Sequence, residues 1–341
     1  MTSLLNVRQL TVELPTPAGW VRPVNEVSLR INAGESLGLV GESGSGKTML
    51  ALALMGLLPV GARTSGEAFL VKDIRDVKEV KNVKEKRAGE SAFGAGKNLA
   101  TLNERGWCAV RGGEIAMVFQ EPMTSLNPVM RIGAQIEEAI RAHESGLGTG
   151  EVKNRAVEAL RRAAIPEPEA RAAQYPHQLS GGLRQRAMIA MALAAGPRLL
   201  IADEPTTALD VTVQKQILDL LDRLRRELKL GLLFITHDLG VVAQVADRVA
   251  VMYAGRIIEE GPAREVLAAS RHPYTQGLLN ASPTIERGKL MPIPGAVPQL
   301  TALPPGCAFE PRCSFRRSEC GVAIPELRAA GTTHTARCVL V

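Results

Sequence analysis

Residues 35–50 read ESLGLVGESGSGKTML, and this stretch decides the fold of the chain. A short apolar segment, Leu37 to Val40, runs into G-x-x-x-x-G-K-T and then into helix-forming residues. A glycine-rich phosphate loop requires this strand–loop–helix context. Glycine lets backbone N–H groups curl around phosphate oxygens, and the N-terminus of the following helix adds partial positive charge. The stretch therefore predicts an α/β domain that binds a nucleotide.

The loop residues have separate expected roles. Lys47 places a cation on the β- and γ-phosphates, and Thr48 offers a hydroxyl to Mg²⁺. ATP and Mg²⁺ are thus the expected ligands. The residues expected to contact the nucleotide are Gly41, Ser43, Gly44, Ser45, Gly46, Lys47, Thr48 and Met49.

A second segment, RLLIADEP at residues 198–205, supplies the acids that such a loop needs. Leu199 to Ala202 form an uninterrupted apolar run suited to a buried parallel strand. Asp203 follows where the strand emerges and is expected to hold Mg²⁺. Glu204 comes next and is expected to orient and deprotonate the attacking water.

Composition limits the class of protein. The 341 residues are 45% hydrophobic and 22% charged, which suits a globular chain with a core. The formal net charge is +6, but aromatic residues are only 3%, so the stacking platforms of single-strand nucleic-acid binders are scarce. The N-terminus alternates like a strand, and no uncharged run is long enough to span a bilayer. We expect a cytosolic chain that binds no nucleic acid and reaches a membrane only through partners.

Residues 178–197, QLSGGLRQRAMIAMALAAGP, resemble the signature segment of ABC ATPases. In that family the phosphate loop of one subunit and the signature of another enclose one nucleotide. The resemblance therefore implies a second ATPase subunit, and nucleotide contacts across the dimer from Ser180, Gly181 and Gly182. Leu183 stands where family members usually have glutamine, which removes a polar contact but leaves the phosphate-facing residues.

Other landmarks of the family follow in order. Gln120 resembles the glutamine that touches Mg²⁺ and senses the transmembrane partner, and Asp210 resembles the end of the loop that crosses the dimer interface. His237 resembles the switch histidine that bonds the γ-phosphate. Trp20 is a weak candidate for stacking on adenine, with a loop anchor as the alternative. The resemblance covers about residues 4–265 and implies a RecA-like core, an antiparallel β subdomain and a helical subdomain.

The chain between Asp210 and the apolar segment GLLFITH has helical periodicity. It predicts a βαβ connection that brings Asp203 and His237 to one sheet edge. The residues expected to form its buried face are Val213, Ile217, Leu220, Leu221, Leu224 and Leu228.

Three further segments resemble the oligopeptide/dipeptide branch of ABC importers: residues 120–139, 271–279 and 292–300. This resemblance implies a peripheral ATPase at the cytoplasmic face of the inner membrane that drives import of peptides or related solutes. It also implies a heterodimer with a different ATPase subunit, two transmembrane permease subunits and an extracytoplasmic peptide-binding protein.

The expected domain organisation is an ABC ATPase domain at residues 1–265 and a C-terminal extension at 266–341. Residues 71–108 form a charged insertion, longer than in relatives, in which Val71, Ile74, Val77, Val80 and Val83 recur every third residue. That spacing makes no single helix face, so the insertion is interpreted as a solvated surface segment, with a regulatory or partner-binding role as the alternative.

Four cysteines gather in the extension: Cys307, Cys313, Cys320 and Cys338. In a reducing cytosol metal ligation is favoured over disulfides, and four thiolates suit Zn²⁺ or an iron–sulfur cluster. The spacing lacks the C-x₂-C pairs typical of zinc sites, and resemblance to the peptide-importer branch implies a [4Fe–4S] cluster. Zinc and unligated thiols are the alternatives. The expected role is a structural staple, and Cys108 is expected to be an ordinary unpaired thiol.

Two other classes remain open from the sequence. One is a soluble ABC ATPase acting on nucleic acid or in assembly, and the other is a metal- or redox-sensing adaptor. The single phosphate loop and the absence of sustained heptads favour the importer subunit.

Overall fold

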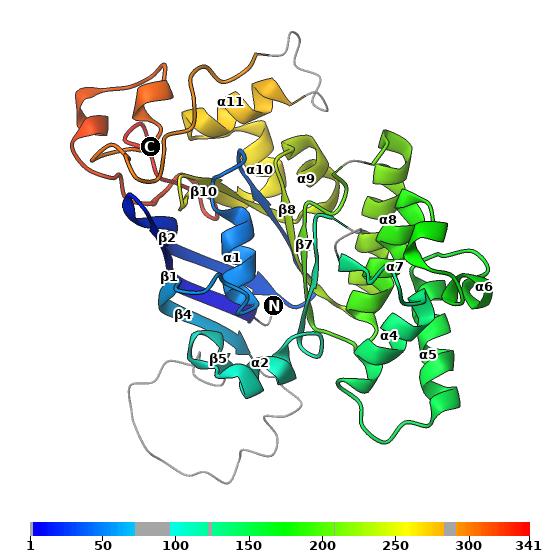
Figure 1. Cartoon of the computed structure of the whole chain (residues 1–341). Helices are drawn as coiled ribbons and strands as arrows, with labels where there is room; N and C mark the ends of the chain where they lie inside the picture. The colour runs from blue at the N-terminus through cyan, green and yellow to red at the C-terminus, as the bar shows by residue number, and fades with distance from the viewer. Residues whose placement is uncertain (1–2, 72–95, 122–124, 208, 283–290) are drawn as a thin grey trace.

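The computed structural model describes residues 3–71, 96–121, 125–207, 209–282 and 291–341 (Figure 1). Its large sheet runs in the order β11-β12-β10-β9-β3-β8-β7-β6. Strand β3 pairs in parallel with β8 and β9, and β7 pairs in parallel with β6 and β8. The strands are β3 (Ser36–Val40), β6 (Ile115–Val118), β7 (Leu199–Asp203), β8 (Gly231–Thr236), β9 (Arg248–Tyr253), β10 (Arg256–Pro262), β11 (Arg328–Ala329) and β12 (Thr335–Ala336).

A smaller antiparallel sheet runs in the order β2-β1-β4-β5. Its strands are β1 (Ser3–Thr16), β2 (Gly19–Asn32), β4 (Arg63–Val71) and β5 (Gly96–Asn98). The predicted N-terminal strand is thereby confirmed. Helix α1 (Lys47–Leu54) follows β3 and packs its buried side chains, Leu50, Ala51 and Leu54, into one core with both sheets.

The two faces of the large sheet bury different helices, because successive strand residues point to opposite faces. Leu199 and Ile201 share a core with α1, whereas Leu200 and Ala202 share another with α7, α8 and α9. Figure 1 shows α1 and these three helices on opposite sides of the central strands. The bounds are α7 (Gly181–Leu193), α8 (Val211–Leu228) and α9 (Leu239–Val245).

Helix α8 confirms the predicted βαβ connection between β7 and β8. Ile217, Leu220, Leu221 and Leu224 are buried as expected. Leu228 was predicted for the same face but is 41% exposed, because it is the last residue of the helix and lies at the edge of a cavity.

A helical region packs around its own apolar core and against α7. It contains α4 (Ile132–Arg141), α5 (Thr149–Arg162), α6 (Pro168–Ala172) and the short η3 (Pro176–Gln178). Of the expected insertion, residues 72–95 lie outside the described residues. The remainder forms β5, η2 (Leu99–Thr101) and α2 (Glu104–Val110), in which Trp107 is buried and Cys108 is exposed. Among the described helices, none has both the length and the apolar character needed to cross a membrane.

The C-terminal extension continues the large sheet. Strand β12 pairs with β10, in which Glu259 stands opposite Ala336 and is fully buried. Its carboxylate accepts hydrogen bonds from the backbone N–H groups of Arg271 and His272, and the ring of His334 lies 2.8 Å from it. The other elements are α10 (Ala263–Ala268), α11 (Pro273–Ala281), η4 (Glu310–Arg312) and η5 (Ser318–Gly321). Sheet pairing and this carboxylate tie the extension to the core.

Replacing Leu221 by alanine should lower the free energy of unfolding by about 2–5 kcal/mol, because a 2% exposed leucine leaves a cavity under the sheet. The measurement is urea unfolding followed by circular dichroism. Val211→Ala on the same helix is the matched control: this side chain is 82% exposed, so its effect should stay within about 0.5 kcal/mol. Equal effects of the two substitutions would contradict the assigned buried face.

Candidate nucleotide site

The phosphate loop lies between β3 and α1, with close backbone contacts that only glycine permits. Gly46 precedes the helix with φ 106°, and a Cβ there would lie 1.9 Å from the carbonyl oxygen of Pro23. A Cβ on Gly41 would lie 2.2 Å from the carbonyl oxygen of Met252. Strands β2 and β9 therefore hold the loop from both sides, and larger residues at these two positions would push it out of shape.

Lys47 is only 5% exposed and folds over its own loop. Its Nζ donates to the carbonyl oxygens of Gly41 at 2.7 Å and Glu42 at 3.0 Å. Burial lowers the pKa of Lys47, while the carboxylates of Glu204, Asp203 and Glu42 oppose that change. The ammonium group is thus held at the loop, where the sequence places the phosphates.

Asp203 ends β7 and is 3% exposed. Burial raises its pKa, a hydrogen bond from Thr48 opposes the rise, and the nearby charge of Glu204 adds to it. Within the described part of the chain, its Oδ1 is buried with no hydrogen-bond partner. An orphaned carboxylate oxygen beside a threonine hydroxyl fits the oxygen donors that Mg²⁺ prefers.

Glu204 is the centre of a polar cluster at the carboxyl ends of three neighbouring strands. Its Oε2 accepts hydrogen bonds from Gln120 Nε2 at 3.2 Å and Thr207 Oγ1 at 2.9 Å, and its Oε1 lies 3.4 Å from His237 Nδ1. The structure thus brings Gln120, Glu204 and His237 together, and it places Asp203 and His237 at one sheet edge as the βαβ connection predicted. Thr207 was missed, because a threonine after a strand carries no signal of its own.

The backbone of Glu204 is left-handed, with φ 47°. Its N–H donates to the carbonyl oxygen of Ile235 on β8 at 2.9 Å. A non-glycine residue in this region is uncommon and is often found at functional sites. The turn aims the carboxylate along the sheet edge toward His237, whose side chain is 60% exposed, and away from the core.

The signature residues lie elsewhere in the chain. Ser180 caps α7 and accepts the N–H of Leu183 at 3.4 Å, while Gly182 packs so close to Val213 that a Cβ would lie 2.8 Å from it. Asp210 caps α8 by accepting the N–H of Val213 at 2.9 Å. Since α7 and α8 lie across the sheet from α1, the structure does not bring the signature to the phosphate loop of the same chain.

All of the predicted nucleotide contacts stay predictions, and four of these residues lie as follows. Ser43 and Gly44 are exposed in the loop, whereas Met49 packs partly into the core beneath α1. Trp20 is 46% exposed at the start of β2, and the guanidinium carbon of Arg63 lies 4.1 Å from its ring centre. Arg63 therefore covers one face of the ring.

The four cysteines of the extension line one small cavity, together with His272 and Phe309. The backbone N–H of Cys307 donates to the carbonyl oxygen of Cys320 at 2.7 Å. Burial raises the pKa of Cys307 to about 11, and the other three thiols add to the rise. Across the described ranges, no three His, Cys, Asp or Glu side chains are grouped so that they could hold a metal ion. The four cysteines thus line one cavity, and their ligation of a metal stays a prediction.

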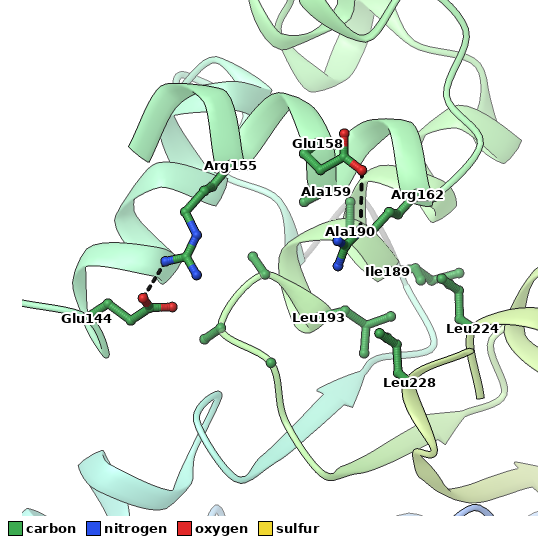
Figure 2. Close-up of a pocket in the computed structure, with 14 residues that line it drawn as sticks. Glu144, Arg155, Glu158, Ala159, Arg162, Ile189, Ala190, Leu193, Leu224 and Leu228 are labelled. Atoms are coloured by element: carbon green, nitrogen blue, oxygen red, sulfur yellow. Dashed lines mark hydrogen bonds and ion pairs between the residues drawn. The ribbon is translucent and has the colours of Figure 1, made fainter. Parts of the chain in front are cut away.

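A separate cavity lies between the helical region and the core (Figure 2). Its apolar wall comes from α7 and α8, including Ile189, Leu193 and Leu224. The ion pairs Arg155–Glu144 and Arg162–Glu158 lie at its rim. None of the predicted nucleotide or metal residues lines it, so it is distinct from the candidate site.

Comparison with known proteins identifies two families along the chain. The family described as ABC transporter matches residues 24–207, and the oligopeptide/dipeptide transporter C-terminal region matches residues 258–320. A peptide import ATP-binding protein of Brucella melitensis is 49% identical, over 98% of this chain and 96% of that protein. The oligopeptide transport ATP-binding protein OppD of Salmonella typhimurium is 47% identical, over 94% and 89%.

Two solved structures have the same core. A dimeric structure of the ATP-binding cassette MJ0796 with ADP and phosphate superposes with a TM-score of 0.61 at 27% identity, covering 76% of this chain and 99% of that one. The protein cbiO1 from Clostridium perfringens, part of the ABC transporter complex cbiONQ, gives a TM-score of 0.60 at 26% identity, covering 79% of this chain and 92% of that one. The predicted ABC ATPase fold is confirmed.

Asp203→Asn should stabilise the Mg²⁺-free protein at neutral pH. A carboxyl whose pKa is raised on folding contributes stability below its usual pKa of 3.8, and that contribution is lost as pH rises through the raised value. The asparagine carries no charge to bury, so the gain in melting temperature should grow as pH rises above about 3.8 and should level off once the pH has passed the raised pKa of Asp203. Differential scanning calorimetry in EDTA measures it.

Mg²⁺ with ATP should then raise the melting temperature of the native chain more than that of the variant, because ligand binding stabilises the folded state. A variant that melts below the native chain at every pH, and gains as much from Mg²⁺, would contradict this assignment of Asp203.

Proposed function

The chain belongs to the ABC transporter ATPase family, and on that premise we propose that it is the ATP-hydrolysing subunit of an importer of dipeptides, oligopeptides or a related small solute. The match of residues 258–320 to the oligopeptide/dipeptide transporter C-terminal region favours this role over a soluble ABC ATPase that acts without a membrane partner. It equally favours transport over a metal- or redox-sensing adaptor.

The cluster around Glu204 is the observation that carries the catalytic part of the proposal. Glu204 accepts the proton of the attacking water, since it lies beside the phosphate loop at the edge where β6, β7 and β8 end. Gln120 and His237 hold the carboxylate, and His237 is the proposed hydrogen-bond partner of the γ-phosphate. Lys47 offsets the negative charge that develops on the phosphoryl oxygens. Mg²⁺, held by Thr48, Asp203 and Gln120, adds a second positive charge at those oxygens when bound.

Separation of α1 from α7 by the sheet supports a dimeric site. Ser180, Gly181 and Asp210 are exposed on the far side, where they are free to meet the phosphate loop of a second ATPase subunit. The MJ0796 structure bound to ADP and phosphate is itself a dimer. We assign a different ATPase subunit as the partner, which makes the pair a heterodimer.

The segment after Gln120 is the proposed contact with the permease subunits. Gln135 is 7% exposed and holds this loop through hydrogen bonds with the backbone of Asn127 and Met130. Val129 projects from it at 80% exposure, which leaves an apolar side chain for a partner to cover. Through two permease subunits the chain is placed at the cytoplasmic face of the inner membrane, and an extracytoplasmic peptide-binding protein acts on it only through them.

The extension at residues 266–341 is proposed to hold a [4Fe–4S] cluster on its four cysteines, with residues 1–265 as the ATPase domain. One cavity lined by all four thiols supports the cluster. The cluster would staple a proline-rich segment that has little apolar surface to bury.

In proteoliposomes containing the whole transporter, peptide-loaded binding protein should stimulate ATP hydrolysis and peptide uptake together. Glu204→Gln should lower kcat for hydrolysis by about 10²–10⁴-fold, because glutamine does not accept the proton, and should leave ATP binding intact. Radiolabelled uptake and phosphate release measure the two activities.

Glu227→Gln is the matched control, since Glu227 is an exposed acid on α8 that pairs with Arg223 at 3.7 Å. A native rate of hydrolysis in Glu204→Gln would contradict the assignment of Glu204 as the general base. A rate of ATP hydrolysis that does not change when peptide-loaded binding protein is added would contradict the proposed role in import.

The chain purified without oxygen should contain about four iron atoms and absorb broadly in the visible blue. Cys320→Ser should lose the iron, because Cys320 is buried in the cysteine cavity, whereas Cys108→Ser should keep it, because Cys108 is exposed on α2. Elemental analysis and absorption spectra measure both. A chain that contains one zinc ion and no iron would contradict the proposed [4Fe–4S] cluster.

A further inference from the structure

Two residues of the C-terminal extension, Tyr274 and Arg312, bind the phosphate loop through Glu42. The backbone N–H of Glu42, the second residue of the loop, donates to the hydroxyl of Tyr274 at 2.8 Å. The guanidinium of Arg312 donates to both carboxylate oxygens of Glu42, at 2.7 Å and 3.0 Å. Neither residue was a predicted site residue, because 232 and 270 positions separate them from Glu42 along the chain.

Arg312 is fixed on every side. Its side chain is 4% exposed, its Nε donates to the carbonyl oxygen of Pro294 at 3.0 Å, and one Nη lies 3.3 Å from the hydroxyl of Tyr253. The rings of Tyr253 and Phe309 lie within 6.0 Å of the guanidinium carbon. A buried, bidentate pair of this kind is stronger and more directional than a surface ion pair.

Residue 42 is consequently tied through all its polar groups. Its N–H and carboxylate bond to the extension, and its carbonyl oxygen accepts from Lys47 Nζ at 3.0 Å. Two consequences follow for the loop. Its backbone is fixed before a nucleotide arrives, and the negative charge of Glu42, which would repel phosphate, is cancelled by Arg312.

We propose that Arg312 is a positioning residue of the ATP site, which acts through Glu42 to preorganise the phosphate loop and to neutralise it for phosphate. This inference rests on the proposed function, because it requires ATP to bind that loop. Arg312 itself does not touch the nucleotide. Preorganisation raises affinity by removing the cost of ordering the loop on binding.

Arg312 also links the loop to the cysteine cavity. It ends η4, which lies between Cys307 and Cys313, and it directly precedes Cys313. The fold of the segment that carries the four cysteines, residues 307–338, therefore sets the position of the Arg312 guanidinium. Nucleotide affinity consequently depends on a segment that is remote in sequence and takes no part in hydrolysis.

The test measures ATP binding to the purified full-length chain by isothermal titration calorimetry, with kcat measured in the assembled transporter. Arg312→Gln should weaken ATP binding about tenfold, which corresponds to about 1.4 kcal/mol, and should change kcat at saturating ATP by less than about twofold. Arg312→Lys should recover part of the affinity, because it restores the charge without the two-pronged contact. Arg316→Gln, at an exposed arginine of the same extension, should bind ATP like the native chain.

A double-mutant cycle separates positioning from a general structural effect. In the Glu42→Gln background, Arg312→Gln should cause little further loss, since Arg312 acts through that carboxylate. Native affinity in folded Arg312→Gln, or an undiminished tenfold loss in the Glu42→Gln background, overturns the proposal. Should Arg312→Gln not fold, Arg312→Lys carries the same cycle. A native chain that does not bind ATP would instead refute the proposed function.

Discussion

Parallel pairing of β3, β8, β7 and β6 is the constraint on which the rest of the structure depends. Parallel strands end at one edge of a sheet, so residues far apart in sequence arrive together without direct attraction. The phosphate loop, Asp203 and His237 follow three of these strands. The sheet holds them close enough for a phosphate and a metal ion to be bound between them.

Parts of the site could be predicted because they depend on neighbours in the chain or on strand order. The loop around Lys47 is local, and the approach of Gln120 to Glu204 follows from parallel topology. Thr207 and Arg312 could not be predicted, since their roles depend on a turn and on packing across 270 residues. Leu228 was assigned to the core by periodicity alone, which does not show where the covering sheet ends.

The C-terminal extension is integrated more deeply than its composition suggested. β12 adds to the edge of the large sheet, and Glu259 binds three groups of the extension inside the fold. The buried rings of Tyr253, Tyr274 and Phe309 pack on one another with centroids 4.5–5.4 Å apart. This aromatic cluster joins β9, α11 and the segment before η4, so the cysteine cavity and the phosphate loop share one packed wall.

The pairing of Glu42 with Arg312 also bears on synthesis of the protein. A ribosome makes the phosphate loop early and its arginine partner 270 residues later. While the nascent chain grows, Glu42 has no such counter-charge, and β3 lacks its neighbours β8 and β9. If Arg312 positions the loop as proposed, full affinity for nucleotide is reached only after Arg312 has been made. A truncated product, released before Arg312, would carry the complete loop sequence without its clamp.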